Sequence, residues 1–169
     1  MLLNLQVKNL ALIEKAEVSF SEGLNILTGE TGAGKSIIIG SVNMALGGKT
    51  SRDMIRQGAD YAYVELVFSV DDPVKRKRLE ELDLDLPEDG TIIISKKIMP
   101  TRSLSKINDE TVTTGRLKEI TSLLIDIHGQ HEHQSLLYKS KHLQILDAYA
   151  RSQTQPLKEK ISVNYHQYQ

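Results

Sequence analysis

Gly29-Glu30-Thr31-Gly32-Ala33-Gly34-Lys35-Ser36 is the stretch that decides the fold class of this chain of 169 residues. It satisfies the pattern G-x-x-x-x-G-K-[ST], in which glycines let the backbone curl so that successive N–H groups face phosphate oxygens. A helix beginning at this point adds its positive N-terminal end. We expect Lys35 to contact the β- and γ-phosphates and Ser36 to place its hydroxyl on Mg²⁺. The stretch predicts a site for a nucleoside triphosphate with magnesium, although kinases, GTPases, helicases and ABC-type ATPases share the pattern.

The elements around this loop predict a domain that mixes strands and helices. Leu24–Thr28 is expected to be a short strand ending at the loop, and Lys35–Leu46 a helix whose buried face carries Ile38, Val42 and Leu46. Further strands are expected at Leu2–Leu10, Ala16–Phe20, Tyr61–Val70, Thr91–Met99, Leu104–Ile107 and Glu110–Val112. A tight hairpin turn is expected at Asn108-Asp109. We also expect a helix from Pro73 to about Leu82 and a short helix at Leu117–Ser122 that runs into a strand at Leu123–Ile127. We therefore expect an α/β (mixed α+β) nucleotide-binding domain whose sheet combines parallel and antiparallel strands.

Composition narrows the classes of partner. The chain has 21 basic and 22 acidic residues and no cysteine, so a global positive field, disulfides and thiolate metal sites are excluded. No apolar run approaches the roughly 20 residues that span a bilayer. Polar residues interrupt the N-terminal apolar stretch, which argues against a signal peptide. We expect a cytoplasmic protein without a membrane partner.

A second group of polar residues follows the apolar run Leu123–Ile125. Asp126 could hold Mg²⁺ through water as in a Walker B strand, or Asp126-x-x-Gly129-Gln130 could act as in a GTPase, with Gln130 orienting the attacking water. A third possibility is the Q-loop of an ABC-type ATPase, in which Gln130 touches magnesium and the γ-phosphate. No Asn-Lys-x-Asp element for reading guanine is present, and Ile127 stands where a Walker B strand has an acidic residue. The purely structural alternative is that Asp126 caps a turn.

Two other clusters have simple explanations. His128, His131 and His133 fit no common metal-ligand spacing, so hydrogen bonding beside phosphates is favoured over zinc binding. The basic run Lys75–Arg78 is typical of a solvated helix face, with phosphate contact as the alternative.

The end of the chain predicts a helix that needs a partner. From about Lys139 the chain becomes steadily more polar, and after Pro156 only Leu157, Ile161 and Tyr165 keep an apolar spacing of four. Such a helix is stable only against another helix, as in a coiled coil. We expect a nucleotide-binding lobe over residues 1–138 and a helix leading into a coiled coil over 139–169.

Three segments resemble one family. Leu24–Thr28 joined to Gly29–Ser36, Ile55–Ala59 and, most specifically, Asp126–Leu137 with its His-Gly-Gln-His-Glu-His-Gln core are similar to the RecN family of bacterial DNA-repair ATPases. These proteins are grouped with the structural-maintenance-of-chromosomes (SMC) proteins, whose heads are ABC-type ATPases. The resemblance runs along nearly the whole chain. One departure is Asn108-Asp109, where the family usually has an Asn-Gly turn, which should change local geometry but not chemistry.

The resemblance implies the N-terminal lobe of an ATPase head that binds ATP and Mg²⁺ in DNA double-strand break repair and recombination. Gly29–Ser36 would bind ATP, Ser36 and Gln130 would hold magnesium, and Lys35 and Gln130 would be the catalytic residues. Lys8 and Asn9 would contact the nucleotide at the end of the first strand. Arg52 and Arg56 would lie near nucleotide or DNA, unless Arg56 pairs with a carboxylate.

The same resemblance implies several partners. A C-terminal lobe of the same head would supply the signature motif and the acidic base, so this chain alone should hydrolyse ATP slowly or not at all. A second head would close an ATP sandwich, and the nucleoid-associated complete protein would bind DNA, at ends or single strands. Two other functions stay open: a GTPase switch using Asp126, Gly129 and Gln130, and a non-enzymatic assembly module with a vestigial loop.

Overall fold

The first part of the chain folds around a six-stranded sheet. The computed structural model describes residues 1–29, 34–127, 142–143, 146–147 and 149–168, and the chain divides into two units, Met1–Asp126 and Ile127–Gln169. The strands follow the order β2-β1-β3-β4-β5-β6, where β1 is Leu2–Leu10, β2 Ile13–Ser19, β3 Ala62–Ser69, β4 Thr91–Ile98, β5 Ser103–Ile107 and β6 Glu110–Val112. Every pair of neighbouring strands is antiparallel. The α/β class is confirmed, but the parallel pairs that we expected are not found among the described residues.

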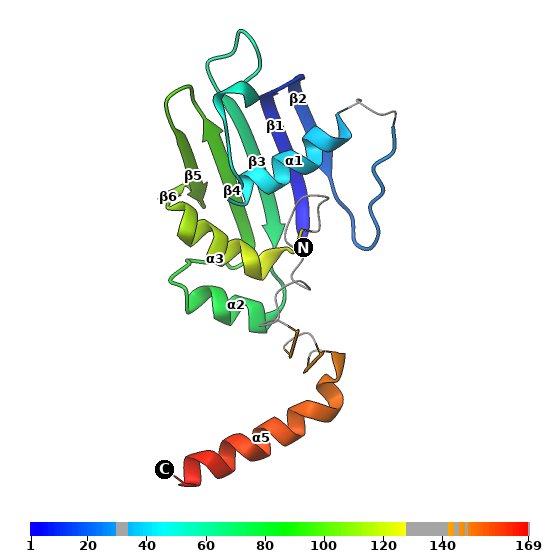
Figure 1. Cartoon of the computed structure of the whole chain (residues 1–169), viewed down its shortest axis with the longest axis vertical. Coiled ribbons are helices and arrows are strands. Elements are labelled where there is room, and N and C mark those ends of the chain that lie inside the picture. Colours follow the sequence, from blue (N-terminus) through cyan, green and yellow to red (C-terminus); the bar gives the residue numbers. More distant parts are fainter. Residues whose placement is uncertain (30–33, 128–141, 144–145, 148, 169) are drawn as a thin grey trace. The chain divides into compact units, whose positions relative to one another are not determined.

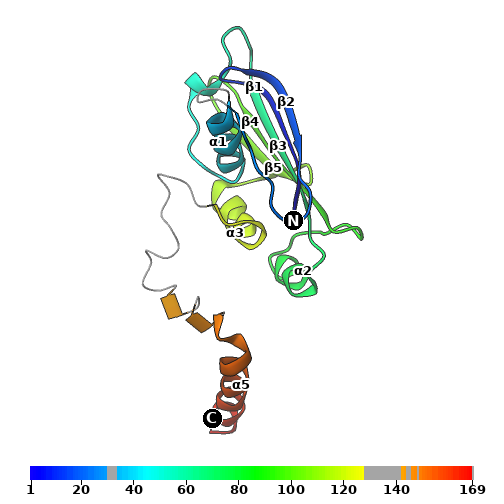
Figure 2. The ribbon, with the colours of Figure 1, turned by 90° about the vertical axis from the view of Figure 1, so that its right-hand side faces the viewer.

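One face of the sheet forms the core because its strands alternate apolar and polar residues. Along β3, Ala62, Val64, Leu66 and Phe68 are at most 1% exposed, while the residues between them are half-buried. Two helices cover this face: α1 (Lys35–Ala45) packs on β1, β3 and β4, and α3 (Thr114–Leu124) packs on β5. Figures 1 and 2 show both helices on the same side of the sheet.

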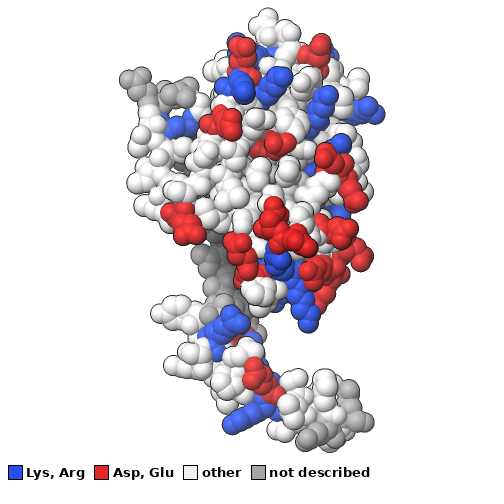
Figure 3. Space-filling view, turned by 180° about the vertical axis from the view of Figure 1, so that it is seen from behind, with Lys and Arg blue, Asp and Glu red and all other residues white. Residues whose placement is uncertain are grey.

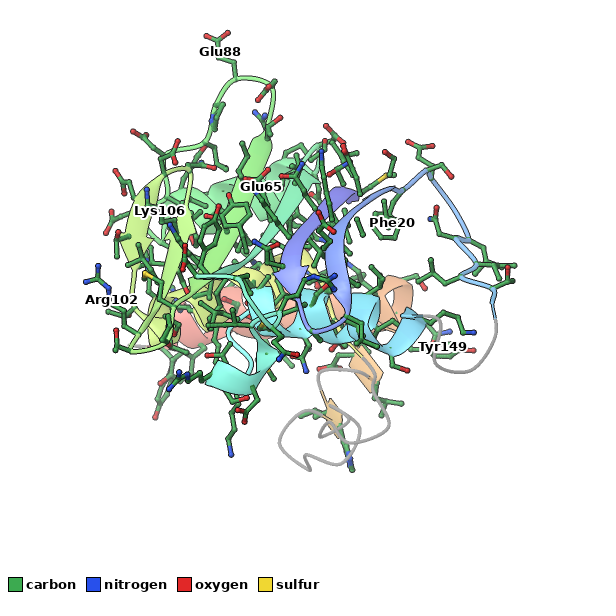
Figure 4. The ribbon with its side chains drawn as sticks, turned by 90° about the horizontal axis from the view of Figure 1, so that it is seen from above. Phe20, Glu65, Glu88, Arg102, Lys106 and Tyr149 are labelled. Atoms are coloured by element: carbon green, nitrogen blue, oxygen red, sulfur yellow. The ribbon has the colours of Figure 1, made fainter. Side chains whose placement is uncertain are left out.

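The opposite face of the sheet is open to solvent in the described unit. No described helix lies against it (Figure 2), and the space-filling view from behind shows acidic and basic side chains intermixed over the strands (Figure 3). Glu65 of β3 and Lys106 of β5 project from this side, away from α1 (Figure 4). The sheet therefore has an apolar face under the helices and a polar face toward water, as is common for antiparallel sheets.

Side chains set the starts of two helices. Asp72 accepts a hydrogen bond from the backbone N of Val74 at 2.8 Å, and Pro73 opens α2 (Pro73–Glu80), which contacts α3. Thr113 caps α3 in the same way, with its hydroxyl accepting from the backbone N of Arg116 at 3.3 Å. These caps satisfy N–H groups that a helix leaves unpaired at its start. A 3-10 turn, η1, spans Arg52–Met54.

The hairpin between β5 and β6 confirms the turn predicted at Asn108-Asp109. Both residues have positive φ, 46° and 66°, as a two-residue hairpin of the favoured twist requires. Asn108 also joins neighbouring segments, because its Oδ1 accepts from the backbone N of Ile93 at 2.9 Å and its Nδ2 donates to the carbonyl of Asp85 at 3.2 Å. Asp109 at the second position carries the strain that a glycine would avoid.

Two predicted strands are wrong. Leu24–Thr28 forms no strand, and Leu24 and Ile26 are 86% and 71% exposed, because no described strand pairs with this segment. Leu123–Ile127 is not a strand either, since α3 continues to Leu124. Leu124 prolongs the helical spacing of the buried Leu117 and Ile120, so the apolar run belongs to the helix rather than to a strand.

The buried face of α1 also differs from our expectation. The fully buried positions of the helix are Ser41, Met44 and Ala45, followed by Leu46 just after it, whereas Ile38 and Val42 are half-buried. The predicted helix Lys35–Leu46 is itself confirmed, because α1 begins at Lys35 and ends at Ala45.

The second unit contains α5 (Arg151–Tyr168), which confirms the helix prediction over these residues and includes Pro156. Lys158 Nζ forms an ion pair with Asp147, and the Thr154 hydroxyl donates to the carbonyl of Ala150 at 3.2 Å. The apolar side chains Leu157, Ile161 and Tyr165 are 57–67% exposed. The boundary that we predicted at residue 138 lies outside the described residues.

Candidate nucleotide-binding site

The loop ahead of α1 is built on glycines with positive φ. Gly34 is the N-cap of α1 with φ 92°, a conformation that side chains rarely adopt. A Cβ added to Gly34 would meet no atom within 4 Å, so the backbone angle, not space, requires glycine here. At the other end of the loop Gly29 has φ 150°, and its carbonyl accepts a hydrogen bond from Lys35 Nζ. The lysine therefore folds back across the loop.

The start of α1 has no side-chain cap among the described residues, whereas Asp72 and Thr113 cap α2 and α3. Gly34 has no side chain to accept from the first N–H groups, and the first turn holds no acidic residue. Ser36 is exposed in that turn. A helix start directs backbone N–H groups and the positive end of the helix dipole toward a ligand. Together with the Lys35 ammonium and the Ser36 hydroxyl, this donor set fits a triphosphate with magnesium.

The chain matches the AAA domain family AAA_23 over residues 4–165. It belongs to this family. The DNA repair protein RecN of Halalkalibacterium halodurans is 42% identical over 99% of this chain and 30% of its own length. RecN of Bacillus subtilis is 39% identical over 99% of this chain and 29% of its own length. The resemblance to RecN is confirmed, and the chain spans about 30% of the length of these relatives.

A solved structure confirms the fold of this AAA domain. It comes from work on ATP-driven dimerisation and DNA-stimulated activation of SMC ATPases, and it matches the chain with a TM-score of 0.62 at 21% identity. The match covers 96% of this chain and 97% of that one. The chain therefore has the fold of an SMC-type ATPase head lobe.

Lys8 lies on the open face of the sheet in this AAA domain. Lys8 is exposed and pairs across β1 and β3 with Tyr63, on the face opposite the buried Val7 and therefore opposite α1. The described residues do not bring Lys8 together with Lys35. Asn9 has φ 53°, and its carbonyl accepts from the backbone N of Arg56 at 3.0 Å, so the nucleotide contact predicted for Asn9 stays a prediction.

Arg56 has a structural role in this AAA domain. Its guanidinium donates to the carbonyl of Leu12 at 2.8 Å, which ties the segment after η1 to the turn between β1 and β2. Leu10 and Ile55 form a bridge beside it. Arg52 is exposed at the start of η1, so of the two arginines it is the one available to an external phosphate.

The basic run in α2 is only partly a free surface. Arg76 donates to the carbonyl of Val70 at 2.9 Å and to the carbonyl of Glu88 at 2.8 Å, which fastens α2 to the turn before β4. Lys75, Lys77 and Arg78 flank this anchor. This arrangement favours the solvated-face interpretation for the run.

Part of the predicted site lies outside the described residues: Glu30–Ala33, Gln130, and the histidines His128, His131 and His133. Asp126 is described, but it follows the end of α3 rather than a strand. The strand tip that the Walker B and GTPase interpretations need is therefore absent at Asp126. No group of three or more metal-binding side chains occurs among the described residues, and no described helix is long and apolar enough to cross a membrane.

Sequence reasoning missed the exposed apolar surface beside the loop. Leu24, Ile26 and Leu27 are 86%, 71% and 43% exposed before the loop, and Ile39 of α1 is 52% exposed after it. In Figure 1 the segment that follows β2 runs away from the sheet. The sequence signal was present, since these apolar residues surround a phosphate-binding motif, but their assignment to a buried strand concealed it.

Proposed function

We propose that this chain is the ATP- and magnesium-binding lobe of a RecN-type, SMC-like ATPase head that acts in DNA repair. The observation that carries the proposal is the start of α1, where Gly34 at φ 92° leads into an uncapped helix free of acidic residues in its first turn. Such a helix start is suited to binding a phosphate group. The RecN relatives support the placement of this site in a DNA-repair protein.

The residues of the loop have separate tasks in this proposal. Lys35 now donates to the Gly29 carbonyl, and it would exchange that contact for the β- and γ-phosphates, where its charge stabilises the developing negative charge. The N–H groups at the start of α1 orient the phosphates. The Ser36 hydroxyl and Gln130 would hold magnesium, which would supply charge neutralisation of the phosphates when bound.

A second lobe completes the head in this proposal. The apolar side chains Leu24, Ile26, Leu27 and Ile39 are exposed before and after the loop in the sequence, as expected of residues that a partner covers. The C-terminal lobe of the same head would cover them and supply the catalytic base. The isolated chain should accordingly bind ATP and hydrolyse it slowly or not at all.

Two further partners belong to the same proposal. A second head would close each ATP in a sandwich, and α5 would continue into a coiled coil. The spacing of Leu157, Ile161 and Tyr165 on α5 and their exposure of 57–67% support a helical partner. A complete protein of this kind would act on DNA in the cytoplasm, associated with the nucleoid.

A fluorescent-nucleotide competition with magnesium tests the proposal on this chain. ATP and GTP compete against the labelled nucleotide for wild type, Lys35→Ala and Lys49→Ala. Lys49 is an exposed lysine beyond the end of α1, so its replacement removes the same charge away from the loop. We expect ATP to be preferred and its affinity to be lost in Lys35→Ala but kept in Lys49→Ala.

Three other results of these measurements would contradict parts of the proposal. A preference for GTP would replace the ATPase proposal by the switch that uses Asp126 and Gln130. Equal affinity in wild type and Lys35→Ala would remove the loop from nucleotide binding. Rapid turnover by the isolated chain, abolished in Lys35→Ala, would show that the base lies within these 169 residues.

A further inference from the structure

Four neighbouring strands align a row of basic and aromatic residues on the open face of the sheet. Lys15 of β2 lies opposite Lys8 of β1, Lys8 opposite Tyr63 of β3, and Tyr63 opposite Lys97 of β4. Tyr61, just before β3, lies between two of the lysines. Its ring centroid is 5.9 Å from Lys8 Nζ and 4.2 Å from Lys97 Nζ, distances at which a cation attracts the ring face.

No carboxylate within ion-pair distance compensates these lysines among the described residues. The nearest acidic side chains of the same face lie in the next row and are engaged. Glu17 accepts from Asn4 Nδ2 at 3.3 Å, and Glu65 accepts from the Tyr63 hydroxyl at 2.5 Å. Burial, reinforced by Glu65, raises the pKa of Tyr63 to about 12. Tyr63 therefore stays neutral, and the row carries only positive charge.

Sheet stability explains only part of this row, because the Tyr61 ring attracts Lys8 and Lys97 and Lys15 lies on the edge strand β2, whereas the pairing of Lys15 with Lys8 is unfavourable. Lys15 and Lys8 are directly opposite each other, and like charges in that position destabilise a strand pair. Lysines on edge strands prevent unwanted strand pairing, but β1 and β4 lie inside the sheet. An external anion would relieve the repulsion, and its binding gives a reason for Lys8 and Lys15 to lie opposite each other.

Residues of the row also line a cavity. Gln6, Lys8, Tyr61, Tyr63 and Lys97 line a shallow cavity of about 310 Å³. With strands about 4.8 Å apart, the row from Lys15 to Lys97 extends about 14 Å. A cationic track with aromatic rings in a hollow is the arrangement with which proteins hold single-stranded nucleic acid, because backbone phosphates follow the cations and a base stacks on a ring.

We propose that this row binds single-stranded DNA, with the phosphates along Lys15, Lys8 and Lys97 and one base against Tyr61. The proposal rests on the proposed function for the choice of DNA, but its residues are separate from the nucleotide loop. A duplex keeps its bases stacked and cannot place one in the hollow, so a single strand fits better than a double strand. The row lies on the face opposite α1, which leaves both ligands free to bind together.

The test measures fluorescence anisotropy of a short labelled oligothymidylate, without nucleotide, across a series of salt concentrations. The double variant Lys8→Gln/Lys97→Gln removes two phosphate contacts, so the slope of log K against log salt should fall by about 1.4. Lys75→Gln/Lys77→Gln in α2 makes the same change of charge elsewhere and should leave that slope unchanged. Tyr61→Ala should weaken binding roughly 5- to 150-fold, and Tyr61→Phe should restore it.

The outcomes separate this inference from the proposed function. If the α2 variant lowers the slope as much as the row variant, or if Tyr61→Ala has no effect and a duplex binds as well as the single strand, the proposal is overturned. Absence of DNA binding by the wild type also overturns it. Loss of DNA binding in the row variant with ATP affinity intact supports it. DNA binding that depends on the row in a chain without ATP affinity would refute only the proposed function.

Discussion

Substitution of Gly34 by alanine isolates the backbone geometry of the phosphate-binding loop. A Cβ at Gly34 meets no atom within 4 Å, so the cost comes from φ 92° alone. A side chain held in the left-handed region costs about 1–2 kcal/mol. If the loop relaxes in the free protein, the same strain reappears when nucleotide binds. Gly34→Ala should therefore weaken ATP affinity roughly 5- to 30-fold, from the conversion of 1.4 kcal/mol per factor of ten.

Gly40 provides the matched control in the same helix. It too has open space around an added Cβ, but its φ is not in the positive range. Alanine in a helix interior is favoured over glycine by about 0.5–1 kcal/mol. Gly40→Ala should therefore stabilise the chain slightly, by about 2–4 °C in Tm for each kcal/mol, and leave ATP affinity unchanged.

Equilibrium titration with a fluorescent nucleotide and thermal unfolding by circular dichroism measure both effects. The two variants add the same methyl group, one at the N-cap in the loop with φ 92° and one inside α1 without a positive φ. Equal ATP affinities for Gly34→Ala and Gly40→Ala would refute the argument that the left-handed N-cap shapes the phosphate site.

Three further substitutions test the sheet. Lys96 is 3% exposed; its burial lowers its pKa, and the Lys118 cation lowers it further. Lys96→Met should raise the free energy of unfolding by on the order of 1 kcal/mol. As the pH rises, Lys96 loses its proton at a lower pH in the folded chain than in the unfolded chain. Between the lowered pKa and 10.5, the free energy of unfolding of the wild type should therefore rise with pH. That rise should vanish in Lys96→Met when Tm is followed against pH; a wild-type profile identical to that of the variant would contradict it. Lys15→Gln removes the repulsion with Lys8 and should add about 0.2–1 kcal/mol in urea unfolding, whereas a loss of stability would mean that Lys15 has a stabilising partner. Asp109→Gly relieves φ 66° and should add roughly 0.5 kcal/mol, unless the Asp109 side chain stabilises the turn.

The strands could be predicted where one face of each strand is buried. Alternation in Tyr61–Val70 appears in the structure as the alternating burial of β3, because the helices cover one face and water covers the other. The hairpin at Asn108-Asp109 was equally predictable, since Asn and Asp are among the few residues that tolerate two successive positive φ values. Local chemistry determines both features.

The failures arose where an apolar run was taken as evidence of a strand. Leu24–Thr28 is apolar, but a strand requires a neighbour that supplies hydrogen bonds, and the described chain supplies none. At Leu123–Ile127 the run contains the last turn of α3, whose spacing from Leu117 and Ile120 identifies it as helix. A short apolar run cannot by itself distinguish the two.

The face of the sheet on which Lys8 lies could have been predicted from the sequence. The loop motif predicts phosphate contacts for Lys35, and Lys8 was assigned to the same ligand by resemblance. Yet Val7 is fully buried, and neighbours in a strand point to opposite faces. Because α1 must cover the apolar face that Val7 shares, the side chain of Lys8 has to leave on the other side. The alternation of β1 therefore separates Lys8 from the face that α1 covers.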